Sequence, residues 1–137
     1  MFLPEIMRLR IPQVIYQASE NGYQLSNVYK KCAEYAESYS ACTVLIETED
    51  GAIFGALIDT IPICSNKFQG SGDSFVFTLH PEVNKYPFSN KNNQIALFAM
   101  DYFLVGMGDK GPALRVDEQL KIGRSYKSET FQNDPLT

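Results

Sequence analysis

The stretch TVLIETEDGAIFGALI, residues 43–58, predicts two β-strands that pair as a hairpin. Its two halves, 43–48 and 52–58, are rich in β-branched and apolar side chains, which favour extended backbone. Asp50-Gly51 lies between them and is a strong hairpin signal, because a type I′ turn needs positive φ at both of its central residues. Gly55 inside the second half predicts either a bulge or the close approach of another backbone segment.

The chain beyond residue 58 also has the pattern of short strands. Runs of apolar and β-branched residues predict strands at 74–79, 95–98, 103–105 and 113–116, with 120–122 as a further candidate. In the first of these runs, Phe75, Phe77 and Leu79 fall on one face of the strand. Two polar stretches, 62–72 and 84–93, predict loops. Strands at this spacing indicate a sandwich or a barrel rather than βαβ units.

One amphipathic helix is expected upstream of the hairpin. Ser26 is a plausible N-cap, and apolar residues then recur three or four positions apart, at Val28, Cys32, Tyr35/Ala36 and Tyr39. This period predicts a helix over 27–38 whose charged residues face water, namely Lys30, Lys31, Glu34 and Glu37. Farther upstream, residues 14–16 are a short apolar run and Asn21-Gly22 is a turn signal. The expected fold class is mainly β with few helices.

Length and charge set limits on the class of protein. A chain of 137 residues can bury its own core, so we expect residues 1–137 to form a single domain. The net charge is −4 and no basic run is longer than Lys30-Lys31, which disfavours binding to nucleic acid. The opening MFLPEIM lacks the positive charge of a signal peptide, and no apolar stretch is long enough to span a membrane. We therefore expect a soluble, intracellular domain.

The stretch VGMGDKG, residues 105–111, contains the G-x-G-x-x-G spacing of a dinucleotide-binding loop at Gly106, Gly108 and Gly111. Such a loop must follow a strand and open a helix, whose N-terminal amides bind the pyrophosphate. Here Pro112 and the strand-like residues 113–116 follow instead. We therefore predict a glycine-rich turn between two strands, where positive φ or tight backbone packing is needed, and no cofactor.

Cysteine and histidine offer no recognisable catalytic or metal constellation. The three cysteines, Cys32, Cys42 and Cys64, show no C-x-x-C spacing, and with the single His80 they cannot supply a four-ligand zinc site. His80 lies at the end of a predicted strand, and nothing in the sequence places a cysteine beside it. We expect no nucleophilic catalysis and no metal.

Two carboxylates remain open to more than one interpretation. Asp73 closes the turn GSGD at 70–73, and Glu129 lies in SETF at 128–131. Either residue could be a catalytic acid or a metal ligand. The commoner role for a carboxylate beside a glycine turn is to accept backbone N–H groups and fix that turn.

Taken together, these segments resemble the TLDc domain family. The resemblance covers most of the chain in the correct order, from residues 15–16 through NGYQLS (21–26), VYKKC (28–32), TVLI (43–46) and DGAIFGA (50–56). Its most specific parts are FQGSGDSFVF (68–77) and SETFQNDPL (128–136), with LVGMGDKG (104–111), VD (116–117) and LKIG (120–123) between them. The spacing of Pro81-Glu82-Val83 and Tyr86 is similar to the form found beside TBC domains in Skywalker-type trafficking proteins.

The sequence departs from the family pattern in three places. Phe88 and Arg115 stand where other aromatic residues are expected, and the chain contains no tryptophan. The glycine run is interrupted by Met107, Asp109 and Lys110, which affects any glycine-specific role. The chain ends at Thr137, where the family adds a strand, so we expect the final strand to be missing or altered. An edge left open in this way would invite pairing with another chain.

The resemblance implies a two-sheet antiparallel β-sandwich with few helices. It also implies a non-catalytic interaction or regulatory domain linked to oxidative-stress resistance, vesicle trafficking and binding of the vacuolar proton pump. Its expected partners are subunits of that pump or an adjoining TBC domain, in the cytoplasm or at endomembranes. The motif residues with an expected role are Gly70, Gly72, Asp73, Gly106, Gly108, Asp117, Gly123 and Glu129. The alternative is a weak redox or ligand-binding enzyme that uses Asp73, Glu129 and a cysteine.

Overall fold

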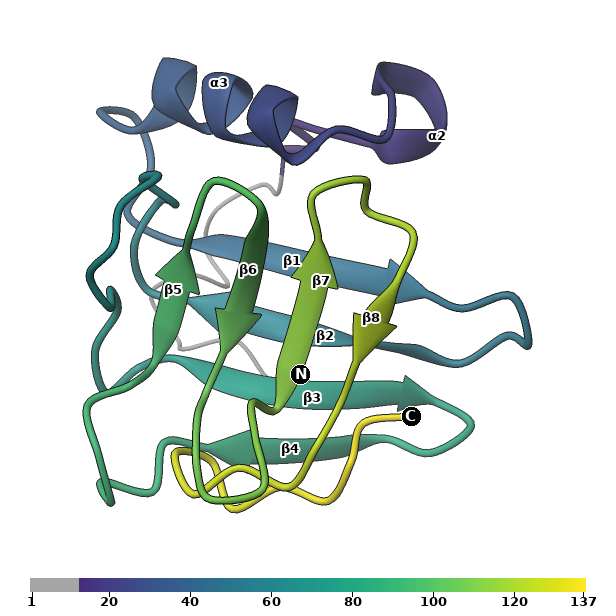
Figure 1. The fold of residues 1–137 in the computed structure, drawn as a ribbon, viewed down its shortest axis with the longest axis vertical. Coiled ribbons are helices and arrows are strands. Elements are labelled where there is room, and N and C mark those ends of the chain that lie inside the picture. The colour runs from purple at the N-terminus through teal and green to yellow at the C-terminus, as the bar shows by residue number, and fades with distance from the viewer. Residues whose placement is uncertain (1–12) are drawn as a thin grey trace.

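The computed structural model of the protein describes residues 13–137. The expectation for the opening MFLPEIM lies outside this range. The described chain forms two four-stranded antiparallel sheets, and Figure 1 shows that the strands of one sheet run steeply across those of the other. The predicted two-sheet sandwich with few helices is confirmed.

The first sheet has the order β1-β2-β3-β4 and begins with the predicted hairpin. Its strands are β1 (Cys42–Glu47), β2 (Ile53–Ile58), β3 (Phe75–His80) and β4 (Asn84–Pro87). The prediction of a type I′ turn is wrong. Glu47 pairs with Ile53, which leaves a connection longer than two residues, and within it only Gly51 has positive φ, at 93°. The Gly51 N–H donates to the Thr48 carbonyl at 3.0 Å. This is the longer hairpin loop in which a turn is followed by a left-handed glycine.

Strand β4 corrects the prediction of a loop over 84–93. Its residues pair with β3, from Phe75 opposite Pro87 to Thr78 opposite Asn84. β4 has a strand neighbour on one side only, and most of its side chains are polar and exposed. Its sequence therefore lacks the alternation of apolar and polar residues by which a strand is recognised. Pro87 is tolerated there because an edge strand leaves some backbone groups outside the ladder.

The second sheet has the order β5-β6-β7-β8. Its strands are β5 (Ala96–Phe98), β6 (Tyr102–Val105), β7 (Leu114–Asp117) and β8 (Gly123–Arg124). The candidate strand at 120–122 is wrong, because these residues form the turn before β8 and Leu120 has φ of 56°. The Asp117 carboxylate holds this turn by accepting the N–H groups of Lys121 and Ile122 at 3.1 and 3.3 Å.

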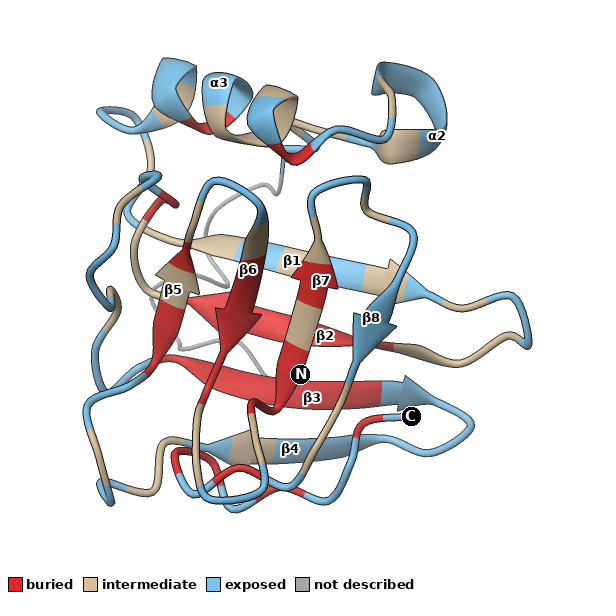
Figure 2. Cartoon of the chain, viewed as in Figure 1, coloured by how far each residue is buried: buried red, intermediate tan, exposed pale blue. Residues whose placement is uncertain are grey.

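The core lies between the facing sides of the two sheets (Figure 2). Val76 of the first sheet and Val105 of the second are both completely buried, and burial of such a side chain stabilises the fold by about 1.5–3 kcal/mol. Leu57, Phe75 and Phe77 form a second buried cluster on the opposite face of the first sheet. Burial on both faces explains why β2 has a nearly continuous apolar sequence instead of an alternating one.

Helix α3 (Leu25–Tyr35) lies across one end of the sandwich in Figure 1. The Ser26 N-cap is wrong, because the helix begins earlier and its N-cap, Gln24, makes no side-chain capping bond. Instead, the Leu25 N–H donates to the Glu118 carbonyl at 2.8 Å, and the Leu25 side chain is 1% exposed. A tertiary contact thus replaces the local cap. The Tyr29 hydroxyl donates to the Ala99 carbonyl at 2.6 Å and fixes the helix on the turn between β5 and β6.

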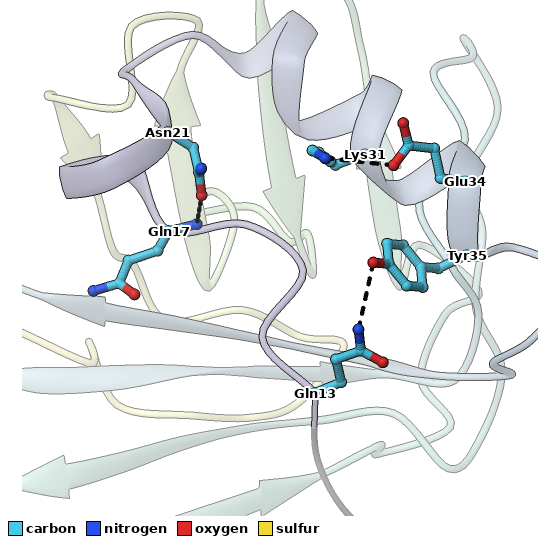
Figure 3. A network of polar contacts seen from close by, with 6 residues as sticks. All are labelled: Gln13, Gln17, Asn21, Lys31, Glu34 and Tyr35. Atoms are coloured by element: carbon cyan, nitrogen blue, oxygen red, sulfur yellow. Dashed lines mark hydrogen bonds and ion pairs between the residues drawn. The ribbon is translucent and has the colours of Figure 1, made fainter.

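The segment before α3 is held by polar contacts, shown in Figure 3. The Gln13 amide donates to the Tyr35 hydroxyl at 3.4 Å, and the short helix α2 (Ala18–Asn21) is closed by a bond from the Gln17 N–H to Asn21 Oδ1 at 2.9 Å. Lys31 and Glu34 form an exposed ion pair at 3.5 Å, which contributes at most about 1 kcal/mol. No helix within residues 13–137 combines the length and the hydropathy needed to cross a membrane.

Candidate functional site

The glycine stretch at 106–111 is a turn between β6 and β7, as predicted. Gly106 and Gly111 have positive φ of 75° and 126°. The Gly106 N–H donates to the Ile95 carbonyl at 2.6 Å. Strand β7 follows the turn where a nucleotide-binding loop would open a helix.

A second segment of the chain, 128–131, lies directly against these glycines. A Cβ atom at Gly108 would be 2.7 Å from the Glu129 nitrogen, and one at Gly106 would be 3.0 Å from Phe131 Cδ2. The Met107 carbonyl accepts the N–H groups of Glu129 and Thr130 at 3.0 and 3.3 Å. Gly106 and Gly108 are therefore required because another part of the chain packs onto their backbone.

Residues 89–92 hold the 128–131 segment from another side. The Ser89 N–H donates to the Thr130 carbonyl at 2.8 Å, and the Ser89 hydroxyl donates to the Glu129 carbonyl at 2.6 Å. The Thr130 hydroxyl lies 2.7 Å from Asn92 Oδ1. Three separate parts of the sequence thus meet through backbone and side-chain hydrogen bonds at the end of the sandwich away from α3 (Figure 1).

Asn133 completes this arrangement and has no exposed surface. Its side-chain oxygen accepts the Ser128 N–H at 3.2 Å and the Ser128 hydroxyl at 2.6 Å. Its amide nitrogen donates to the carbonyls of Tyr126 and Asp134, both at 2.9 Å. Sequence reasoning missed this role, although asparagine side chains commonly bond nearby backbone groups in turns.

The turn at 70–73 is fixed by Asp59, a residue that sequence reasoning also missed. The Asp59 carboxylate accepts the Ser71 N–H at 2.6 Å, the Asp73 N–H at 3.3 Å and the Ser74 hydroxyl at 2.8 Å, together with the Ser71 hydroxyl. The bonds that were expected at Asp73 are accepted by Asp59, to which Asp73 itself donates its N–H, and the Asp73 side chain is exposed. Desolvation acts to raise the pKa of Asp59, but the hydrogen bonds from Ser71, Ser74 and Asp73 outweigh it and lower that pKa.

Replacing Asp59 by asparagine is expected to lower the free energy of unfolding by about 1–2 kcal/mol at pH 7, because a charged acceptor of several hydrogen bonds is lost. The carboxylate's folded pKa is depressed, so its contribution is present above the unfolded pKa and disappears as the pH falls through the lower folded value. Urea unfolding should therefore show a smaller difference in free energy of unfolding between the original chain and Asp59→Asn at about pH 3 than at pH 7. Asp73→Asn is the matched control and should change stability by less than about 0.5 kcal/mol. A gap that stays constant across this range would contradict the assignment.

The predicted motif residues fall into two groups. The first group belongs to the connected loops just described and consists of Gly70, Gly72, Asp73, Gly106, Gly108 and Glu129. The turn at 70–73 adjoins the other loops because a Cβ on Gly72 would lie 3.7 Å from Phe88, the neighbour of Ser89. Asp117 and Gly123 lie at the turn between β7 and β8, beside the start of α3. A Cβ on Gly123 would be 3.0 Å from the Arg115 carbonyl, so this glycine also permits a close backbone approach.

An open depression of about 510 Å³ adjoins the 128–131 segment. It is lined by Asp109, Lys110, Lys127, Ser128, Glu129 and Gln132. Within residues 13–137 the hydrogen bonds do not join Asp73 to Glu129; Glu129 bonds through its backbone to Met107 and Ser89. The depression thus presents mixed charge and two exposed carboxylates, those of Asp109 and Glu129.

The cysteines and the histidine lie in different places. Cys32 is buried on α3, Cys42 begins β1 and Cys64 is exposed in the loop after β2. Desolvation by burial raises the pKa of Cys32, and that of Cys42 to about 12, so both remain protonated and weakly nucleophilic near neutral pH. His80 pairs with the end of β2 opposite the one that pairs with Cys42. Across residues 13–137, the acidic, histidine and cysteine side chains form no group of three that could hold a metal ion.

Comparison with known proteins places these features in a family. The model of the TLDc domain matches residues 1–137. Human "Oxidation resistance protein 1" is 30% identical over 90% of this chain, and chicken "Nuclear receptor coactivator 7" is 29% identical over 91%. "GTPase-activating protein skywalker" of Drosophila melanogaster is 24% identical over 98%. The chain spans 14%, 14% and 25% of the length of these three relatives. This chain belongs to the TLDc domain family.

Proposed function

We propose that this chain is a non-catalytic protein-interaction and regulatory domain. The observation that carries the proposal is the match to the TLDc domain over the full 137 residues. The geometry supports it, because the glycines and polar residues of the most specific motifs make structural contacts between loops. These contacts favour a structural role for the motif residues within an interaction surface.

We further propose that the domain acts in oxidative-stress resistance and vesicle trafficking. The printed names of two relatives, oxidation resistance protein 1 and the GTPase-activating protein skywalker, support this pathway. The resemblance to the TLDc family suggests subunits of the vacuolar proton pump as a partner, or an adjoining TBC domain in a longer protein. Work of this kind would place the chain in the cytoplasm, at the surface of endomembranes.

Direct binding to the purified vacuolar proton pump tests this proposal. The immobilised chain is expected to retain pump subunits above the level of an unrelated β-sandwich domain of similar charge. Gly108→Ala should weaken that retention, because a Cβ at this position displaces Glu129 and the 128–131 segment. Gly72→Ala is the matched control, since its Cβ meets only ordinary contact. Retention no higher than that of the unrelated domain would refute the pump as partner.

A redox or ligand-binding enzyme is the second candidate. The exposed thiol of Cys64 and the exposed carboxylate of Glu129 favour it, whereas the raised pKa values of Cys32 and Cys42 oppose it. The test is peroxide consumption by the purified chain and by its Cys64→Ser, Asp73→Asn and Glu129→Gln variants. A rate for the unmodified chain equal to that of buffer would eliminate this candidate.

A further inference from the structure

The outer face of the second sheet carries an unusual set of side chains. Strand register places Leu97, Leu104, Arg115 and Arg124 in one row across the four strands, on the side opposite the core residues Ala96, Val105 and Leu114. Tyr102 and Asp117 form the neighbouring row on the same side. In Figure 1 neither helix of the described chain covers this face, which we name the Arg115 face.

Two arginines stand directly opposite each other in this row. Arg115 of β7 pairs with Arg124 of β8, and directly opposed like charges destabilise a pair of strands. The ion pair found within residues 13–137 joins Lys31 and Glu34, so no carboxylate of the described chain forms an ion pair with either guanidinium, although Asp117 lies in the neighbouring row. The Arg115 guanidinium instead lies 4.6 Å from the centre of the Tyr102 ring. This cation–π contact holds the guanidinium against the Tyr102 ring without forming an ion pair.

The composition of the Arg115 face is that of a binding surface. Arginine and tyrosine are, with tryptophan, the residue types enriched among those that dominate binding energy at protein interfaces. Leu97 and Leu104 continue the same row, but Leu97 is half-buried and Leu104 is buried, so the accessible part of this face is formed mainly by Arg115, Arg124 and Tyr102. The chain as a whole carries a net charge of −4, so two opposed arginines without an ion pair are a local exception to its acidic character. An anionic partner would remove the repulsion between them.

We propose that the Arg115 face binds an acidic segment of a protein partner. This inference rests on the proposed interaction function and narrows it to a surface and a partner chemistry. Guanidinium groups form bidentate hydrogen bonds with carboxylates, and the adjacent, half-buried Tyr102 and Leu97 suit peptide side chains. A lipid surface fits less well, because such binding uses clusters of about 4–8 basic residues and this face holds two with Asp117 beside them.

A titration followed by NMR tests the inference. The probes are a Glu-rich peptide containing leucine, a Lys-rich peptide of the same length, and phosphatidylserine vesicles. The Glu-rich peptide should shift the amide signals of β6, β7 and β8, with an affinity that falls as salt rises. Arg115→Ala/Arg124→Ala should weaken binding by about tenfold or more, since charged pairs at an interface are costly to truncate. Lys30→Ala/Lys67→Ala removes the same charge elsewhere and should keep the affinity within about twofold.

Folding of the variant is checked by its melting temperature, which should equal or exceed that of the original chain because the like-charged pair is gone. The inference is overturned if the Glu-rich peptide shifts other strands, or if the Lys30/Lys67 variant loses as much affinity. Vesicle binding that depends on the two arginines, without peptide binding, also overturns it in favour of lipid.

The same variants separate this inference from the proposed function. Equal binding of the proton pump by the original chain and by Arg115→Ala/Arg124→Ala overturns the Arg115 face as the docking surface and leaves the interaction function standing. Arginine-dependent binding of the Glu-rich peptide without any pump binding supports the Arg115 face and removes the pump as partner.

Discussion

Replacing Asn133 by alanine is expected to lower the free energy of unfolding by about 3–4 kcal/mol. The side chain is fully buried and makes four hydrogen bonds, two through its oxygen to Ser128 and two through its nitrogen to the carbonyls of Tyr126 and Asp134. Alanine leaves all four partners in place without their bonds. Each buried polar group left unsatisfied costs about 1–3 kcal/mol, and some of that cost is recovered when water enters. Chemical denaturation with a two-state fit measures the change.

The matched control for this variant is Asn93→Ala, because Asn93 is exposed in the loop before β5. Its substitution should change stability by less than about 0.5 kcal/mol. Asn133→Asp separates hydrogen bonding from volume, since it keeps the size of the side chain but cannot donate to both carbonyls. It should destabilise the protein at neutral pH about as much as alanine does, with partial recovery when the carboxyl is protonated. A loss under about 1 kcal/mol for both variants would show that the network contributes little.

Asn133 also illustrates what the sequence could and could not predict about the site. Its four partners are within seven residues along the chain, yet their value depends on burial against loops that are distant in sequence. The same holds for Asp59, whose partners Ser71 and Ser74 come from a different turn. A sequence shows which residues can accept hydrogen bonds but not which of them lie close to a given turn. Asp73 was chosen because it adjoins the glycine turn in sequence, whereas Asp59 reaches the same turn only in the folded chain. At Gly106 and Gly108 the structure shows the tight backbone packing that was predicted, whereas Gly72 has room for a Cβ atom.

A helix or strand could be predicted from the sequence where its own residues show a pattern of apolar side chains. The β1–β2 hairpin and the strands from β5 to β7 have apolar patterns of their own, and all were predicted. Strand β4, with the sequence NKYP, has no such pattern and exists because β3 offers it a hydrogen-bonding edge. The start of α3 was misplaced for a related reason, since its first N–H is satisfied by Glu118 from the other end of the chain. Tertiary partners of this kind cannot be read from local spacing.

Replacing Gly55 by alanine is expected to destabilise the protein by about 3 kcal/mol or more, or to prevent folding. A Cβ atom at this position would lie 1.9 Å from the Val44 carbonyl oxygen and 3.0 Å from its carbon, both in the neighbouring strand β1. Because the obstacle is backbone, it can be relieved only by moving β1 away from β2 and weakening their pairing. Overpacking of this kind is among the few causes of large single-residue effects. The sequence allowed a bulge or a close approach at Gly55, and the structure selects the close approach.

Two other glycines show which property of Gly55 matters. A Cβ at Gly51 meets open space but would require φ of 93°, so Gly51→Ala should cost about 1–2 kcal/mol from backbone strain alone. Gly72 has neither restriction, because its Cβ would be 3.7 Å from Phe88, and Gly72→Ala should lie within about 0.5 kcal/mol of the original chain. Urea unfolding of the three variants should therefore rank them Gly55, Gly51, Gly72 in decreasing cost. If Gly55→Ala is no more destabilising than Gly51→Ala, then β1 can yield at Val44 and the close approach is not what requires glycine there.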